Sequence, residues 1–549
     1  MFKKAHVAAL GTLLSPGLAA ACGGLFCNNA QPVNQAAERI LFAHDGEQMQ
    51  MHVRITYQGP PTEFGWLLPV PADVETGLSS ETLFTQLDQT FAPVFQLNFE
   101  FEGENCFPDA GFPEGGAGGA GGEGGGGGGV QVLSREPVGP YDRSILQAES
   151  VDRLLEWLAD NDYQVPPGSE STLQPYVDLG AAFVALKLLP GADAADIVPL
   201  RLSFSGNTPA VPIRPTAVAA EPDMGVIIQL LGPSRAVSTN YLHVQINEAA
   251  IDWAAAGANY ADVVSQAADE AGGRAFATDF AGRHADVFFF GTLTPDVVEA
   301  ISAAATLGDV MRFVDLNDPD VQRIMRSNLV PPEGLTVDDV LIFPFDFTDL
   351  PVDGAAIAAA INDEIVEVRA PIIALFERHP YLTRVFTTMS PAEMIDDPVF
   401  AFNPDLPDQG RTRTATQVVN CETNDSYLRV GGQRVLRGEP IQRAGGETVR
   451  GVEQIGAALI ERQYAAGQSE VVEDRRDQIG MGGAGGAGGA GGAGAAGGAG
   501  GSGGAGGANN DAGLGQDGGD GGCDCDVSGG GPGLGVLLLG LLGLVRRRR

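Results

Sequence analysis

The sequence predicts an α+β fold in which short strands and helices are mixed without a regular alternation. Alternating apolar residues indicate strands, as in Met49 to Tyr57, and apolar residues at helical spacing indicate helices, as in Val151 to Asn161. No strand–helix–strand repeat runs through the chain, which disfavours a doubly wound sheet. The predicted body, residues 22–478, is long enough for one large domain or two closely packed ones.

The first predicted element is a β-hairpin. In Met49 to Tyr57, Met51, Val53, Ile55 and Tyr57 fall on one face, and polar residues fall on the other. Asp45-Gly46 is a typical hairpin turn, so this strand should pair with Arg39 to Ala43.

Further strands and helices follow in order. The other predicted strands are Phe64–Pro71, Phe95–Phe101, Ala182–Leu189, Pro199–Phe204, Val226–Leu231 and Leu242–Ile246. The predicted helices are Ser80–Phe91, Val151–Asn161, Tyr260–Ala271, Pro295–Val314, Gly354–Glu377 and Val452–Ala466. Ser79 or Ser80 should cap the first helix, and Pro371 should break or kink the fifth. A domain boundary near Asn247 to Gly257 is a second option beside a single domain.

Two glycine-rich tracts cannot contribute to a packed core. Of the 77 glycines, 12 lie in residues 115–129 and 26 in residues 480–530. The first tract lies in a predicted disordered insertion at about residues 109–130. The second forms most of a flexible tether, residues 479–530, whose Gly-Gly-Ala repeats predict a root-mean-square reach on the order of 35–40 Å.

The N-terminus has the pattern of a secretory signal peptide, residues 1–21. Lys3 and Lys4 give a positive start, Val7 to Ala20 is mostly apolar, and small residues precede Cys22. Lipidation of Cys22 is the alternative to simple cleavage, although Leu18 lies one residue too far from it for the usual lipobox.

The C-terminus carries a second address in residues 531–549. A Cys523-Asp-Cys525 motif precedes the short apolar run Leu534 to Val545, and Arg546 to Arg549 follow. Arginines at the cytoplasmic end of an apolar helix would leave the body outside. This arrangement resembles the myxobacterial C-terminal sorting signal, which implies processing by a sorting machinery and surface attachment through Cys523 or Cys525. An uncleaved transmembrane tail is the alternative.

Motifs in the body resemble an uncharacterised bacterial family, the domain-of-unknown-function family numbered 2330. They are Ala21–Cys27, Pro32–Ile40, Trp66–Pro71, His379–Met394 and Asp397–Phe400. The resemblance runs from Cys22 to about Phe400 and implies an exported location without an established activity.

The charge excludes some partners, and the location favours disulfides. A formal net charge of −37 argues against nucleic acid as a partner. An even cysteine count outside the cytoplasm favours disulfides among Cys22, Cys27, Cys106 and Cys421, which allow three pairings. Cys22 with Cys27 is the local option and would leave Cys106 with Cys421. A metal site at Cys22 and Cys27 lacks further ligands at typical spacing, so no metal or cofactor is predicted.

No catalytic motif stands out. The histidines of the body are scattered, and no two have ligand spacing. His379 is the best catalytic candidate, with Glu393 or Asp397 as a partner, although a packing or capping role is the commoner use of such a residue.

Two further motifs have structural explanations. Asp315 to Asp320 is similar to the start of a calcium loop, but a helix cap at Asp318 with Pro319 at the first helical position explains it more simply. Phe64 and Trp66 suit an exposed aromatic patch or, as the burial tendency of such residues favours, the core.

Together these features favour an exported, surface-tethered binding or interaction protein. The alternatives are an extracellular hydrolase, whose site would form only in the fold, and an envelope scaffold or spacer.

Overall fold

The structure, a computed structural model, describes residues 34–45, 48–58, 64–103, 131–190, 192, 196–284, 293–423, 425–435, 440–442 and 448–479. These residues lie within one unit, Met1–Gly485, and form helices and several sheets, which confirms the predicted α+β class. Several predicted features lie outside the described residues: the signal peptide, the glycine-rich insertion, almost all of the tether, the C-terminal tail, and Cys22, Cys27, Cys106, Cys523 and Cys525.

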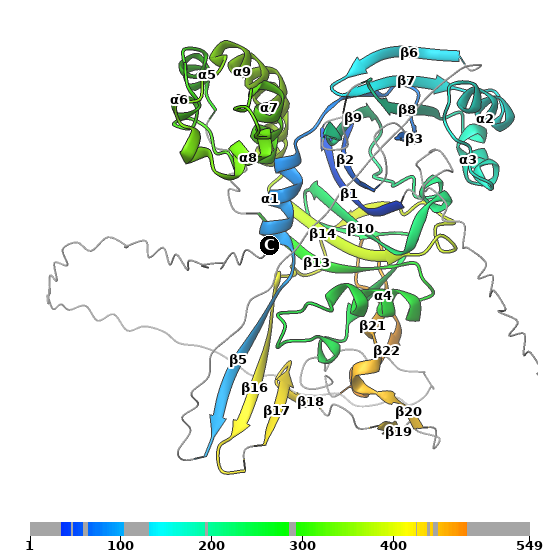
Figure 1. The fold of residues 1–549 in the computed structure, drawn as a ribbon. Coiled ribbons are helices and arrows are strands. Elements are labelled where there is room, and N and C mark those ends of the chain that lie inside the picture. The colour runs from blue at the N-terminus through cyan, green and yellow to red at the C-terminus, as the bar shows by residue number, and fades with distance from the viewer. Residues whose placement is uncertain are drawn as a thin grey trace, which may run out of the picture. The chain divides into compact units, whose positions relative to one another are not determined.

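A ten-stranded sheet forms the centre of the fold (Figure 1), with the strand order β22-β21-β12-β13-β14-β10-β1-β2-β9-β4. Its strands are β1 Asn34–Asp45, β2 Gln48–Gln58, β4 Glu75–Leu78, β9 Leu200–Ser205, β10 Ala220–Gly232, β12 Leu242–Ile246, β13 Ala275–Arg283, β14 Tyr381–Met389, β21 Ala457–Arg462 and β22 Glu470–Asp474. Strands β1 and β2 pair antiparallel as the predicted hairpin. Strands β12 and β13 are adjacent and parallel. Residues 247–257 are part of the segment that connects these two neighbouring strands, so they do not separate two domains.

A four-stranded sheet packs against the centre. It contains β3 Gly65–Val70, β6 Gln131–Val138, β7 Tyr141–Gln147 and β8 Ala182–Leu188 in the order β3-β8-β7-β6. Trp66 and Val184 join Ile40 and Val53 of the central sheet in one core. Because Phe64 and Trp66 are 0% and 4% exposed, the core interpretation of these aromatics is confirmed.

Helices α2 Val151–Asp160 and α3 Ser169–Asp178 contribute Leu154 and Leu173 to a second core with Phe183 of β8. A further sheet, in the order β18-β17-β16-β5, contains β5 Val94–Glu102, β16 Thr412–Asn420, β17 Ser426–Val430 and β18 Gln433–Val435. Its long strands β5 and β16 run parallel side by side (Figure 1). Two short pairs complete the strands: β11 Arg235–Ser238 with β15 Phe400–Asn403, and β19 Pro440–Gln442 with β20 Thr448–Gly451.

Helix α1 Glu81–Phe91 begins at the predicted cap Ser80, whose hydroxyl accepts the Leu83 N–H at 3.2 Å. Helix α4 Tyr260–Glu270 connects β12 to β13 and packs Val264 and Ala267 against that part of the sheet.

A helical insertion separates β13 from its sheet neighbour β14. It consists of α5 Pro295–Ser302, α6 Leu307–Val310, α7 Pro319–Asn328, α8 Val337–Ile342, η5 Pro344–Phe347, α9 Gly354–Ile361, η6 Asn362–Val366 and α10 Glu367–Arg378. The insertion has its own apolar core, which includes Ile301, Ile324 and Ile357. Asp318 caps α7 with Pro319 at the first helical position, as predicted.

Three predicted helices are wrong in detail. The single helix expected over Pro295 to Val314 is two helices, because Thr306 accepts the Asp309 N–H and starts α6 anew. The helix expected over Gly354 to Glu377 is present as the contiguous elements α9, η6 and α10, but it is not broken at Pro371, which lies inside α10. Its irregularity is the π-turn η6, where the Glu367 N–H bonds to Asn362 O.

The helix expected over Val452 to Ala466 is instead the 3-10 turn η7 Val452–Gln454 followed by strand β21. Strand β21 pairs on both sides, with β12 and β22, so sheet pairing outweighs its helical spacing. Gly456 begins this segment against α4, where a Cβ atom would lie 2.5 Å from Ala267 N. A larger residue there would prevent the close approach.

Candidate functional site

The predicted catalytic residues His379, Glu393 and Asp397 lie at opposite ends of β14. His379 ends α10 just before this strand, whereas Glu393 and Asp397 follow it. A nine-residue strand spans roughly 30 Å. The structure therefore does not bring His379 together with either carboxylate.

Asp397 has a positioning role in the structure. Its carboxylate accepts the Tyr176 hydroxyl at 2.7 Å and the backbone N–H of Ile213 at 3.1 Å. Burial raises the pKa of Asp397, and these hydrogen bonds partly offset that effect. Glu393 accepts the Ser390 N–H at 2.7 Å in the turn after β14. Both carboxylates thus hold backbone segments in place.

The acidic segment before α7 is a structural junction. Asp318 and Asp320 both bond to Arg369, at 2.6 Å each, so these carboxylates are paired with a cation. Among the described residues, no group of three or more His, Cys, Asp or Glu side chains could hold a metal ion.

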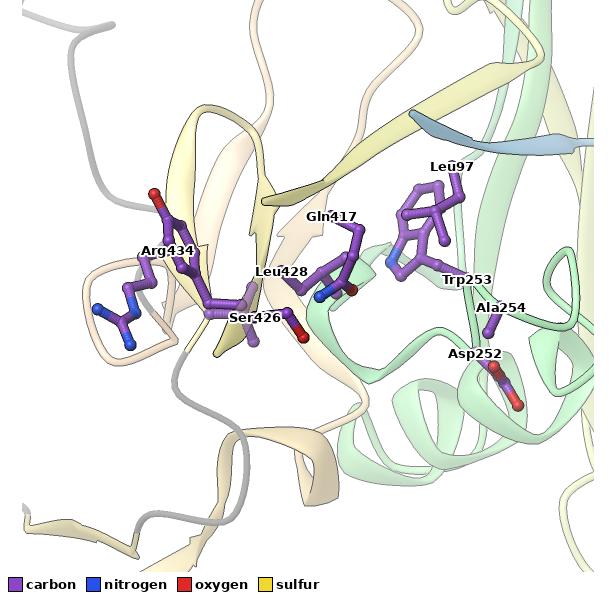
Figure 2. A pocket seen from close by; sticks show the side chains of 10 residues that line it. Leu97, Asp252, Trp253, Ala254, Gln417, Ser426, Leu428 and Arg434 are labelled. Atoms are coloured by element: carbon purple, nitrogen blue, oxygen red, sulfur yellow. The ribbon is translucent and has the colours of Figure 1, made fainter. Parts of the chain in front are cut away.

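A pocket of about 330 Å³ lies between the sheet of β5, β16, β17 and β18 and the loop after the 3-10 turn η4 Glu248–Ala250 (Figure 2). Trp253 forms one wall, and Leu97 of β5 and Leu428 of β17 add apolar surface. The polar residues of its lining are Asp252, Gln417, Ser426, Tyr427 and Arg434. The strand register puts Gln417 and Ser426 on the same face of the sheet as Leu428, whereas Tyr427 and Arg434 lie on the opposite face, at the rim of the cavity. We refer to this cavity as the Trp253 pocket.

Several contacts fix Trp253 in this wall. Its indole N–H donates to Glu248 O at 2.8 Å, and its ring meets that of Phe95 edge to face with centroids 5.5 Å apart. The loop can approach Phe95 only because Gly257 has φ +80° and no side chain, since a Cβ atom there would lie 2.2 Å from the Phe95 ring. The Trp253 ring is therefore held in position in the protein without a ligand.

A cation lies at the rim of the pocket, on the edge strand β18. The Arg434 guanidinium lies 4.5 Å from the centre of the Tyr427 ring. A cation over the face of an aromatic ring is attracted to that ring, so Tyr427 helps to orient the Arg434 side chain. In Figure 2, Arg434 lies beyond the strands β17 and β18 as seen from Trp253, and its side chain points away from Gln417 and Asp252. The cavity suits a small ligand that has an apolar body and hydrogen-bonding groups, and Arg434 adds a positive charge at its rim.

Analysis of the sequence did not single out Trp253, Tyr427 or Arg434. These residues lie on segments that are far apart in the chain, and no short motif contains them. Parallel pairing of β5 with β16, whose register joins Val94 to Thr412 and Glu102 to Asn420, creates the surface that faces Trp253. Only this long-range pairing reveals the pocket.

Cys421 follows β16 directly, and its N–H donates to Glu102 O at 2.9 Å. Cys106 is only four residues beyond Glu102 in the chain. Within the described ranges, none of the helices combines the length and the apolar character that a membrane crossing requires.

Comparison with known proteins gives one match. A family model described as an uncharacterised protein conserved in bacteria (DUF2330) matches residues 16–293. This range covers β1 to β13 and the Trp253 loop, but it ends before the helical insertion. No curated protein and no solved structure matches the chain.

Proposed function

Since the chain belongs to the DUF2330 family of uncharacterised proteins conserved in bacteria, we propose that it is an exported, surface-tethered binding protein and that the Trp253 pocket holds its ligand. The observation that carries the proposal is the combination of a fixed aromatic wall with polar groups that face the cavity. Specific small-molecule sites typically pair an apolar lining with a few convergent polar groups.

The polar groups support recognition of a zwitterionic ligand. The amide of Gln417 and the hydroxyl of Ser426 belong to the lining and supply hydrogen-bonding groups for a ligand. From the rim, Arg434 would attract a carboxylate that extends past the edge strand β18, and Asp252 would attract an ammonium or hydroxyl group. The apolar portion would lie against Trp253.

The termini support export and tethering. Residues 1–21 have the charge, apolar run and small-residue site of a signal peptide. The Cys523-Asp-Cys525 motif, the apolar run and four arginines resemble a sorting signal, and we propose that the membrane or outer surface holds the protein at this end.

We also propose that Cys106 bonds to Cys421, and Cys22 to Cys27. The pairing of β5 with β16 supports the first bridge, because it holds the two segments that lead to these cysteines side by side. Cys106 and Cys421 are more than 300 residues apart in the chain, so this bridge would close a long loop and stabilise the fold by roughly 4–5 kcal/mol.

Mass spectrometry of protein released from its own cells tests export and processing. Under denaturing conditions, we expect a mass that lacks residues 1–21 and the arginine tail and has two disulfides in the body. A chain that keeps its N-terminus and has reduced thiols would contradict the proposal. Under native conditions, additional mass on the folded body would identify a retained ligand.

Tryptophan fluorescence titration with a panel of zwitterionic dipeptides tests the pocket. We expect saturable binding by at least one dipeptide, and Arg434→Gln should weaken it about tenfold, a loss of about 1.4 kcal/mol. Arg326→Gln is the matched control, because it removes an exposed arginine far from this sheet in the chain. Binding that Arg434→Gln and Trp253→Phe leave unchanged would exclude this pocket.

A further inference from the structure

A second cavity contains a chain of hydrogen bonds that the binding function does not use. His243 Nδ1 lies 3.2 Å from Glu461 Oε2, and His243 Nε2 lies 3.0 Å from the Thr278 hydroxyl. A carboxylate, an imidazole and a hydroxyl in this order are the arrangement that activates a hydroxyl nucleophile. The cavity shares no lining residue with the Trp253 pocket.

Three adjacent strands hold these side chains. His243 of β12 pairs directly with Glu461 of β21 and, on the other side, with Phe276 of β13. Thr278 lies two residues beyond Phe276, so its side chain is on the same face of β13. The positions are fixed by the sheet itself, which is a rigid support for a site.

The hydrogen-bond directions suit a base that accepts the proton of Thr278. The Arg235 guanidinium donates to Thr278 Oγ1 at 3.1 Å, which leaves the Thr278 hydroxyl hydrogen to point toward His243 Nε2. His243 Nδ1–H then donates to Glu461. The Arg235 cation would also stabilise negative charge that develops on Oγ1.

The protonation states agree with this arrangement. Burial lowers the pKa of His243, and the hydrogen bond to Glu461 only partly offsets this, so the imidazole is neutral near pH 7. Burial by itself would raise the pKa of Glu461, but the His243 hydrogen bond and the charges of Arg235 and Arg476 lower it overall. A neutral imidazole beside a carboxylate is able to act as a general base.

Thr278 and His243 line a cavity of about 230 Å³ beside β12 and β13, the two parallel strands that α4 connects. Clefts at the carboxyl ends of parallel strands are common ligand sites. Gln409 and Arg413 complete the wall, and Arg413 donates to Thr278 O at 3.2 Å, which holds the Thr278 backbone in place. A cavity of this size admits a short acyl group of a few heavy atoms.

We propose that Thr278, His243 and Glu461 form a hydrolytic site for esters of short-chain carboxylic acids. Thr278 Oγ1 attacks the ester carbonyl while its proton passes to His243 Nε2, and the carbon–oxygen bond to the alcohol breaks as that alcohol takes the proton. Water then attacks the acyl-threonine with His243 as the base, which releases the acid and restores the Thr278 hydroxyl. Glu461 positions the imidazole throughout.

A fluorophosphonate probe tests the nucleophile on the full-length protein. Attack by Thr278 would form an oxygen–phosphorus bond and expel fluoride, with the proton leaving through His243. Peptide mass spectrometry should locate the adduct on Thr278, and p-nitrophenyl acetate hydrolysis should stop as the adduct forms. Circular dichroism should show that the variants at Thr278, His243 and Thr387 keep the native fold.

Thr278→Ser should retain labelling, because it keeps the hydroxyl, whereas Thr278→Val should abolish it. His243→Gln should slow labelling at least about 100-fold. Thr387→Val is the matched control, since Thr387 is another buried threonine, on β14, with its hydroxyl bonded to Thr388 O. Absence of an adduct on Thr278 in the folded protein, or labelling that His243→Gln does not slow, would overturn the proposal.

Discussion

Arg369 of α10 shows how a single buried charge can join parts of the fold. Its side chain is only 4% exposed and contacts Asp318 and Asp320 of the α7 start. The same guanidinium donates to the Thr82 hydroxyl of α1 at 2.8 Å, and Ser80 donates to Asp320 at 2.5 Å. The network therefore connects the helical insertion to α1, a helix that lies more than 200 residues earlier in the chain.

Arg369→Met should destabilise the protein by about 3–5 kcal/mol, because it leaves the buried Asp320 carboxylate without its cation. Urea unfolding followed by circular dichroism measures this change. Arg326→Gln serves as the control, because its partner Asp338 is 64% exposed and such pairs contribute about 0–1 kcal/mol. Equal effects of the two substitutions would show that the network is not important for stability.

His52 predicts a loss of stability in acid. It is fully buried on β2, its Nδ1 lies 2.8 Å from the Ser79 hydroxyl, and burial, with the nearby Arg201 charge, lowers its pKa to about 3. Between pH 6.5 and pH 3 the unfolded chain binds a proton that the folded His52 does not, so the free energy of unfolding falls as the pH falls. Each pH unit in this window costs about 1.4 kcal/mol.

His52→Gln should remove this dependence. We expect the free energy of unfolding of the variant, relative to that of the native protein, to rise by about 2–3 kcal/mol when the pH is lowered from 6.5 to 4.5. Urea unfolding at the two pH values provides the comparison. A difference that is independent of pH would mean that the pKa of His52 is not lowered by folding.

Glu38 of β1 has the opposite dependence. Burial raises its pKa to about 7, although a hydrogen bond with Thr216 acts against this. From pH 4.5 to pH 7 the folded protein keeps a proton that the unfolded chain loses, so the free energy of unfolding falls as the pH rises. Glu38→Gln should gain up to roughly 3 kcal/mol over the native protein in the same interval. Unfolding of both proteins at pH 4.5 and pH 7.5 tests the sign.

At the scale of elements, close crossings depend on glycine. Gly354 begins α9 against the end of α5, where a Cβ atom would lie 2.4 Å from Ala304 O and 2.6 Å from Ile301 O. Ile301 O belongs to α5, and Ala304 O lies in the turn directly after it, which the bond from Ala304 N–H to Ile301 O holds to the helix. The crossing of α5 and α9 therefore requires glycine at this position.

Gly354→Ala should destabilise the insertion by about 1–3 kcal/mol, the usual cost of overpacking. Thermal unfolding measured by circular dichroism detects the change. Gly410→Ala is the control, because a Cβ atom at Gly410 would meet nothing within 4 Å. A stable Gly354→Ala protein would show that α5 and α9 separate at little cost.

Elements with a strong local pattern could be predicted from the sequence. The β1–β2 hairpin and the caps Ser80 and Asp318 depend on neighbours a few residues away, and all are observed. A helix was wrongly predicted where strand β21 lies, because the pairing partner of this strand, β12, lies more than 200 residues earlier in the chain. No strand was predicted for the residues of β14, which the sequence indicated only as part of a family motif. In the structure this strand pairs with β10 and β13 near the middle of the sheet.

The sites could be predicted even less well, because each requires distant segments. His243 and Glu461 are paired across strands, and the sequence shows them only as a scattered histidine and one of 70 acidic residues. The candidate that the sequence favoured, His379, is separated from its expected partners by the length of β14. Convergence of side chains on a sheet face has no signature at short range.

At the scale of the whole molecule, the body and its proposed anchor are joined by a long glycine-rich segment. Ile479, the last residue that the structure describes, is 1% exposed and packs in a core with Trp253 and Ile455. A flexible chain over residues 480–522 would have a reach on the order of 35–40 Å. If the anchor holds the protein at the cell surface, this length sets how far the Trp253 pocket stands from the surface.

Deletion of residues 480–522, with the cysteine motif and the tail retained, should therefore leave the protein attached but reduce the access of large molecules to the body. We expect an antibody against the body to label intact cells several-fold less after the deletion, while the total amount of protein is unchanged. A replacement of the same length that shuffles the glycine, alanine and polar residues should restore labelling, because reach depends on chain length and composition and not on order. Equal labelling of all three forms would show that the tether does not act as a spacer.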